Sequence, residues 1–233
     1  MRFQTLILLL LFFSFGLSAP KAHAFVNGFE LEAGIEVPTQ IGARAKFKLP
    51  GHWYATAGLG YSLNFLVGVG TALASGFGMV YSEEATLMND ALSNNFYIDL
   101  RGGYSFSENQ GFFLEGGYSL LTGGGSATTI QTIDNAVRPL SAYALATDLS
   151  INAGVTLHNL QLMGGYKWSL SENWGLVLSA GLVKPLSASS TLSFSRYYID
   201  QNRMEQDVKN LMNNLYVNQL FLISAGAWVS WKM

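Results

Sequence analysis

The feature that most constrains this chain is a period-two alternation of apolar and polar residues, repeated in one segment after another. Successive side chains of a β-strand point to opposite faces, so each such segment predicts a strand with one apolar face. Beyond the N-terminal region no segment has the roughly 18 consecutive apolar residues of a membrane-spanning helix. Strands that alternate over about 10 residues are typical of transmembrane β-barrels.

The N-terminus has the three regions of a secretory signal peptide. An apolar run over residues 6–17 follows Arg2, and the triplet Ala22-His23-Ala24 completes the pattern. The run is too short for a membrane anchor, which needs about 20 apolar residues. We therefore expect residues 1–24 to be removed on export and residues 25–233 to form one outer-membrane β-barrel domain.

The first predicted hairpin carries acids on one strand and bases on the next, at Glu30, Glu32, Glu36, Arg44, Lys46 and Lys48. If Val37 opposes Ile41 across a three-residue loop, the charged faces of the two strands coincide. That register predicts three cross-strand pairs, namely Glu30 with Lys48, Glu32 with Lys46 and, diagonally, Glu36 with Arg44.

An internal repeat sets the number of strands. Gly102, Gly164 and Gly226 recur at a constant spacing, and the turn 107–109 recurs in sequence at 171–173. Each unit is predicted to consist of a strand, a long connecting excursion and a second strand. Alternation over residues 53–65 and 96–106 supports the two strands of the first unit. Three units and the opening hairpin predict eight strands, an even number typical of bacterial outer-membrane barrels. Ten strands are the alternative, if Ala142–Ile151 is itself a strand.

The lengths of the connections predict which end of the barrel faces which way. The connections at residues 50–51, 107–110 and 171–173 are short, whereas the other ends carry three long excursions. Outer-membrane barrels have short periplasmic turns and long extracellular loops. All five tryptophans then lie at the periplasmic end, where they predict an interfacial girdle: Trp53, Trp168, Trp174, Trp228 and Trp231.

The last strand has two possible face assignments. Hydropathy places Ala225, Ala227, Val229 and Trp231 toward lipid, whereas the repeat places Trp228 there. A β-bulge would reconcile the two assignments.

The charges predicted to face the barrel interior are balanced between acids and bases. They are Glu30, Glu32, Glu36, Asp99 and Glu115 against Arg44, Lys46, Lys48, Arg101 and Lys167. Unpaired charges in a confined interior are costly, so we expect ion pairs that hold the lumen closed. The alternative is a narrow channel, or a conduit for small or hydrophobic molecules past small residues such as Gly58 and Gly103.

Each long loop contains a segment with apolar residues at helical spacing. These segments are Glu83–Leu92, Asp200–Leu215 and the stretch from Ile130 to Leu140, which Pro139 must begin, kink or end. The apolar stripes predict either a lid over the barrel mouth or a binding surface. A hydrophobic ligand, outer-leaflet lipid or an extracellular protein are the candidate partners of such a surface.

Little in the sequence points to catalysis. A barrel-type lipid-modifying enzyme centred on His158 would need a serine two residues away, where Leu160 stands, and an acid behind it. The chain has no cysteine, HExxH motif or Asp-rich calcium loop, and its formal net charge is -2. We expect no enzyme activity, no cofactor, no metal and no nucleic-acid partner.

The signal peptide, eight alternating segments, short turns and aromatic C-terminal strand resemble the small outer-membrane barrels of the OmpA transmembrane-domain, OmpX and opacity-protein type. The chain ends in Trp231-Lys232-Met233, where such families usually end in an aromatic residue. The resemblance implies a monomer in a Gram-negative-type outer membrane, among lipid and lipopolysaccharide, inserted by the barrel-assembly machinery. We predict a sealed lumen and a structural or surface-interaction role through the extracellular loops.

Overall fold

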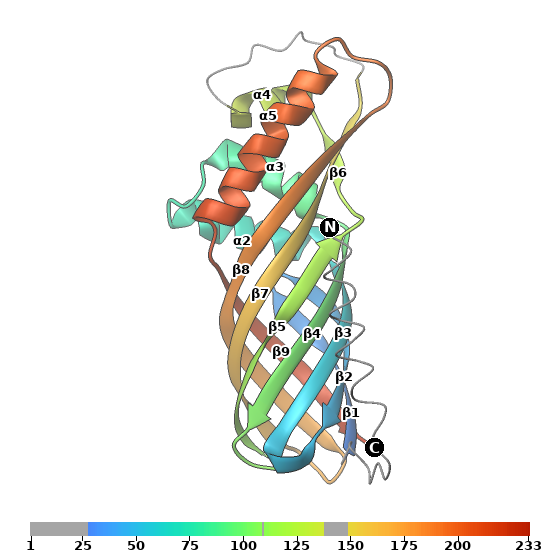
Figure 1. Cartoon of the computed structure of the whole chain (residues 1–233), viewed down its shortest axis with the longest axis vertical. Coiled ribbons are helices and arrows are strands. Elements are labelled where there is room, and N and C mark those ends of the chain that lie inside the picture. The colour runs from blue at the N-terminus through green and yellow to red at the C-terminus, as the bar shows by residue number, and fades with distance from the viewer. Residues whose placement is uncertain (1–27, 109, 138–148) are drawn as a thin grey trace, which may run out of the picture.

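The alternating segments form long antiparallel strands that close into a barrel (Figure 1). The computed structural model describes residues 28–108, 110–137 and 149–233, so the predicted signal peptide lies outside the described residues. The barrel strands are β1 (Gly28–Val37), β2 (Gln40–Lys48), β3 (Trp53–Ser62), β4 (Asn95–Ser105), β5 (Gly111–Thr122), β7 (Ile151–Ser169), β8 (Trp174–Phe194) and β9 (Leu222–Lys232).

Hydrogen bonding between β5 and β7 closes the sheet. The strand order is β5-β4-β3-β2-β1-β9-β8-β7, and the additional pairing of β5 with β7 joins its two ends. A three-residue strand, β6 (Ser126–Thr128), pairs only with the start of β7. The prediction of an eight-stranded antiparallel barrel is confirmed. Of the alternative strand Ala142–Ile151, residues 142–148 lie outside the described ranges, and Ile151 begins β7.

Alternation in each strand separates a polar interior from an apolar exterior. In β4 the side chains of Asp99 and Arg101 are buried inside the barrel, whereas those of Ile98 and Leu100 are 41% and 56% exposed outside it. This arrangement reverses that of a water-soluble protein, in which the apolar face is buried. The barrel wall therefore presents apolar side chains to its surroundings.

Two strands extend beyond the rim of the barrel. β7 and β8 have 19 and 21 residues. Residues 151–156 of β7 and 184–194 of β8 lie beyond the pairing of these strands with β5 and β9, although β7 and β8 remain paired with each other. Helices pack on this ribbon at the upper end of Figure 1. They are α2 (Asn64–Gly76), α3 (Ser82–Leu92), α4 (Ile130–Val137), α5 (Gln201–Asn213) and the π-helix η2 (Asn214–Gln219), while a short 3₁₀ helix, η1 (Pro50–His52), lies in a turn at the opposite end.

The helices share one apolar core with the ribbon. Leu87 of α3, Ile133 of α4 and Met204 of α5 are fully buried in a cluster that includes Val155 and Leu157 of β7. The predicted helical stripes are confirmed in these three helices, with residues 138–140 of the second loop outside the described ranges. None of the described helices is both long and apolar enough to cross a membrane.

The first long loop differs from the prediction. The alternating pattern suggested a strand to Phe65, but β3 ends at Ser62 and α2 begins at Asn64. Asn64 explains the change, because its side-chain Oδ1 accepts hydrogen bonds from Asn89 Nδ2 at 2.8 Å and Ser93 Oγ at 3.2 Å. These bonds hold the start of α2 against α3 and the residues that follow it.

The predicted register of the first hairpin is wrong by two residues. Glu36 opposes Gln40, so the three residues between the paired positions are 37–39 rather than 38–40, and the backbone N–H of Thr39 donates to the carbonyl of Glu36 at 2.7 Å. Glu30 therefore opposes Lys46, and Glu32 opposes Arg44. Because two residues are one period of a strand, every side chain stays on its predicted face.

Two adjacent glycines of β4 provide a test of the interior packing. A Cβ at Gly103 would lie 2.3 Å from the Tyr54 ring inside the barrel, whereas a Cβ at Gly102 would meet no atom within 4 Å. We predict that Gly103→Ala lowers the free energy of unfolding by about 1–3 kcal/mol, because Tyr54 has to move. Gly102→Ala, the matched control, should change it by less than about 0.5 kcal/mol.

Denaturant titration of the refolded barrel in detergent measures both values. Equal effects of the two substitutions would contradict the tight packing of Tyr54 against β4.

Candidate functional site

The most distinctive feature of the interior is a connected chain of buried ion pairs. Glu32 contacts both Arg44 and Lys46, and Arg44 Nη1 lies 3.4 Å from Glu115 Oε1. Arg101 Nη1 lies 3.0 Å from the same oxygen of Glu115. Two arginines from neighbouring regions of the wall thus share one carboxylate.

The chain continues toward the helical end. Arg101 Nη2 lies 2.9 Å from Glu36 Oε2 and also contacts Asp99. Glu36 Oε1 in turn accepts hydrogen bonds from Ser224 Oγ at 3.3 Å and Thr39 Oγ1 at 3.4 Å. The ion pairs are therefore anchored to the β1–β2 turn and to β9.

A second group of charges lies nearer the short turns. Glu30 is placed between Lys48, at 2.8 Å, and Lys167. All ten charged side chains predicted to face the interior take part in ion pairs of one group or the other. The diagonal prediction for Glu36 is wrong, because the observed register places Glu36 opposite Gln40, four residues from Arg44, and Arg101 of β4 reaches it across the lumen.

Aromatic side chains fill the space around the ion pairs. Tyr54 Oη donates to Glu115 Oε2 at 3.1 Å, and Lys46 Nζ lies 4.2 Å from the centroid of the Tyr54 ring. The guanidinium carbon of Arg44 lies 4.3 Å from the centroid of Trp228, a distance typical of a cation–π contact. Both residues are almost fully buried, since Tyr54 is 4% and Trp228 1% exposed.

We call Glu32, Arg44, Arg101, Glu115, Tyr54 and Trp228 the central cluster. Its charged members are each 3% exposed or less. Charges this well buried are stable only when paired and hydrogen-bonded, which the contacts above provide. Side chains occupy the space in front of two small residues of the wall, because the Asp99 carboxylate lies in front of Gly58 and the Tyr54 ring in front of Gly103.

Cavities lie on both sides of the central cluster. The one at the turn end has a volume of about 300 Å³ and is lined by Lys46, Lys48, Lys167, Glu30, Tyr54 and Phe113, among others. The one beneath the helices has a volume of about 40 Å³ and an apolar lining that includes Met88, Leu121, Tyr97 and Tyr216. The second cavity has room for little more than water-sized molecules, far below the several hundred Å³ typical of ligand pockets.

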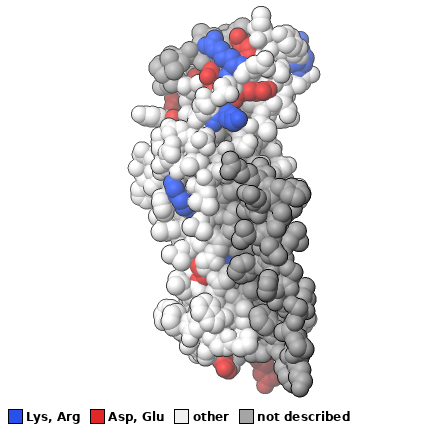
Figure 2. All heavy atoms as spheres, viewed as in Figure 1, with Lys and Arg blue, Asp and Glu red and all other residues white. Residues whose placement is uncertain are grey.

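The outside of the barrel is apolar between two different ends. Exposed leucine, isoleucine and valine side chains surround its middle, including Leu31, Leu59, Leu100, Leu114, Leu162, Leu178 and Val229. In Figure 2 the acidic and basic side chains gather mainly over the helices, while the visible barrel wall carries few. The central part of the molecule thus has the surface of a membrane-embedded barrel.

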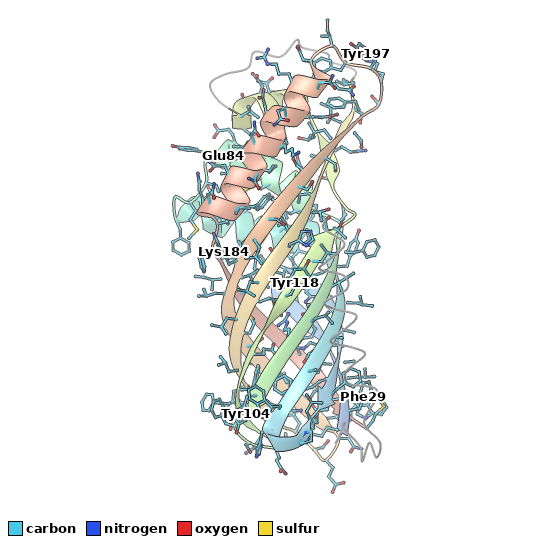
Figure 3. The ribbon with its side chains drawn as sticks, in the orientation of Figure 1. Phe29, Glu84, Tyr104, Tyr118, Lys184 and Tyr197 are labelled. Atoms are coloured by element: carbon cyan, nitrogen blue, oxygen red, sulfur yellow. The ribbon has the colours of Figure 1, made fainter. Side chains whose placement is uncertain are left out.

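An aromatic ring surrounds the turn end of the barrel. Trp53 lies 5.2 Å from Tyr104, Tyr166 lies 4.6 Å from Trp168, and Trp174 lies 6.4 Å from Trp231, measured between ring centroids. Phe29 and Phe47 continue it onto β1 and β2, and Figure 3 shows Phe29 and Tyr104 at this same end. Four of the five predicted girdle tryptophans are 39–57% exposed here.

Trp228 is the exception, and its assignment to the girdle is wrong. Its ring points into the lumen, because β9 is regular from Ala225 to Trp231 in its pairing with β1 and β8 and contains no bulge there. Hydropathy, rather than the repeat, gives the correct face of the last strand. The inward Trp228 ring therefore contacts the guanidinium group of Arg44 in the central cluster.

His158 lies on the outer wall rather than in a reactive group. Its Nδ1 is in hydrogen-bond contact with the hydroxyl of Tyr118, which is labelled in Figure 3. The position where a catalytic triad needs an acid is thus occupied by a phenol. Within the described residues, no group of three or more His, Cys, Asp or Glu side chains is arranged to hold a metal ion.

Comparison with known proteins finds solved structures that resemble this chain in architecture. No family model matches the chain, and no curated protein is similar to it at a significant level. CarO of Acinetobacter baumannii shares 12% identity with a TM-score of 0.41, over 91% of this chain and 100% of that chain. A major outer membrane protein of Thermus thermophilus shares 12% identity with a TM-score of 0.47, over 88% of this chain and 98% of that chain. Similarity at this level supports no argument about function.

Sequence reasoning missed two members of the central cluster. Alternation in β3 puts Tyr54 on the inner face, and for Trp228 hydropathy and the repeat give opposite faces. Neither residue was predicted as a partner of the interior charges, yet both are buried among them. The signal for Tyr54 was its place in the alternation of β3, where Thr56 and Gly58 share its face. The signal for Trp228 was the row of small and apolar residues on the opposite face of β9.

The central cluster generates a stability prediction. Glu115→Gln removes the charge that pairs with both arginines, so we expect the free energy of unfolding to fall by about 3 kcal/mol or more. Glu172→Gln makes the same chemical change in an exposed turn and should alter it by less than about 0.5 kcal/mol. Denaturant unfolding of both refolded variants measures the difference, and a small loss for Glu115→Gln would show that the buried pairs are not interdependent.

Proposed function

We propose that the chain is an integral outer-membrane β-barrel with a sealed lumen, which acts as a structural or surface-interaction protein through its helical loops. The observation that carries the proposal is the central cluster, a set of buried, mutually paired side chains inside the barrel. A barrel of eight strands has an interior just wide enough for its own side chains. Such an interior leaves the helical end as the working surface.

The outer surface supports a membrane location. The apolar middle of the barrel needs an apolar surrounding, and the aromatic ring at the turn end matches the girdles of outer-membrane barrels. We place the short turns in the periplasm and the helices outside the cell. The partners are then outer-membrane lipid and lipopolysaccharide, with the assembly machinery acting on a monomer. The architecture agrees with the resemblance to small barrels of the OmpA and OmpX type.

A narrow channel is the second candidate function. The turn-end cavity of about 300 Å³ favours it, as do the neutral polar side chains that continue beyond the central cluster. Ser119, Asn159 and Gln161 are buried there between the ion pairs and the helices. In this alternative the ion pairs rearrange and the path conducts small ions.

Planar-bilayer recordings of the refolded protein separate the two candidates. We expect no discrete conductance steps from the intact protein, because the central cluster blocks the lumen. Protease trimming of the loops should leave it silent, since the cluster lies within the barrel and not in the helices. Steps from intact protein would support the channel, and steps only after trimming would assign the seal to the helices.

The recordings require proof that folded barrels are present. Folded barrels migrate differently on a detergent gel before and after boiling, and we expect that shift here. The same preparation should float with lipid vesicles in a density gradient. Identical gel bands together with failure to float would contradict the membrane barrel itself.

A further inference from the structure

Helix α2 carries an apolar face that no described residue covers. Phe65, Val69, Leu73 and Phe77 are 60%, 45%, 50% and 67% exposed. They are spaced four residues apart, so they form one stripe along the helix. The opposite face, with Leu66, Val67 and Ala74, is buried in the protein.

The helix has no charged residue on any face. The whole stretch from residue 49 to residue 82 contains no Asp, Glu, Lys or Arg, and charge returns at Glu83 and Glu84 in the first turn of α3. A helix that is apolar all round is typical of a buried environment. By contrast, the outward positions of α5 include Arg203, Lys209 and Asn210.

Two polar side chains of α2 form hydrogen bonds within the protein. Thr71 Oγ1 donates to the carbonyl of Val67 at 3.1 Å, and Asn64 Oδ1 accepts from Asn89 and Ser93. The exposed face of α2 is therefore as apolar as the barrel wall below it.

The stripe continues the apolar wall of the barrel. Leu59 is 67% exposed on the outside of β3, and Tyr61, next on the same face, packs edge-on against Phe96 at 5.6 Å. Phe65 follows one helical turn later. α2 also lies against the rim, because a Cβ at Gly70 would be 2.5 Å from Pro38 in the β1–β2 turn, and in Figure 1 it is the helix drawn nearest the barrel.

We propose that α2 lies in the outer leaflet of the membrane, with the face formed by Phe65, Val69, Leu73 and Phe77 against lipid acyl chains. The inference rests on the proposed membrane barrel and extends its lipid contact beyond the strands. Helices that lie in an interface bury their apolar face about 5–10 Å into the boundary between headgroups and acyl chains, roughly one helix radius with its side chains. Tyr81, 77% exposed between the stripe and Glu83, has the amphipathic side chain typical of that boundary.

Single-cysteine labelling tests the inference without interference, because the chain has no native cysteine. Val69→Cys and Leu73→Cys carry a bimane label in vesicles of phosphatidylcholine with brominated acyl chains. Leu59→Cys on the barrel wall is the lipid-facing control, and Asn210→Cys on α5 is the water-facing control. Each variant is first checked for the folded gel shift, so that only folded protein is compared.

We expect the brominated lipid to quench the labels at positions 69 and 73 to within about twofold of the label at position 59. Aqueous iodide should quench them less than the label at position 210. Quenching by iodide, as at position 210, would overturn the inference, and protection from both quenchers would assign the face to a second copy or another protein and also overturn it. If the label at position 59 escapes the brominated lipid, the membrane barrel itself fails, which distinguishes the two failures.

Discussion

Closure of the sheet is the constraint on which the rest of this structure depends. Hydrogen bonds between β5 and β7 leave the barrel wall without a free edge, and every strand then has one face inside and one outside. Polar residues on the inner face lose access to bulk water, so their charges have to pair with one another. No described residue covers the apolar side chains of the outer face, so they require an apolar surrounding. The central cluster and the apolar wall are two consequences of one topology.

The helical end forms where two strands extend beyond the closed barrel. β7 and β8 continue past their barrel partners as a two-stranded ribbon, and one face of the ribbon is apolar at positions such as Ile151 and Val155. An isolated ribbon is only marginally stable in water. The stripes of α3, α4 and α5 cover this face and bury methionines against it. The helices are thus part of the fold, and their outer surfaces remain for interaction.

The helices also show what periodic patterns reveal. α3 and α5 have charged outer faces and apolar inner faces, so their amphipathic spacing was visible in the sequence. α2 has no such contrast, because protein covers one face and, in our proposal, lipid the other. Its glycines and its start directly after β3 made it look like the end of a strand and a flexible loop. Amphipathic spacing reveals a helix in the sequence only when one face of the helix is apolar and the other is polar.

Alternation along the chain was enough to predict the strands, their faces and the set of charges inside the barrel, because the period of two is a local property of an extended chain. The pattern also predicted the ion pairs Glu30–Lys48 and Glu32–Lys46, which form, but it did not determine the register of the hairpin or the remaining partners. A shift of two residues in the first hairpin preserves every face, so the pattern could not distinguish the two registers. Nor could it show that Arg101 reaches Glu36 across the lumen or that Trp228 packs under Arg44. Those contacts join strands distant in sequence, and only closure of the barrel brings them together.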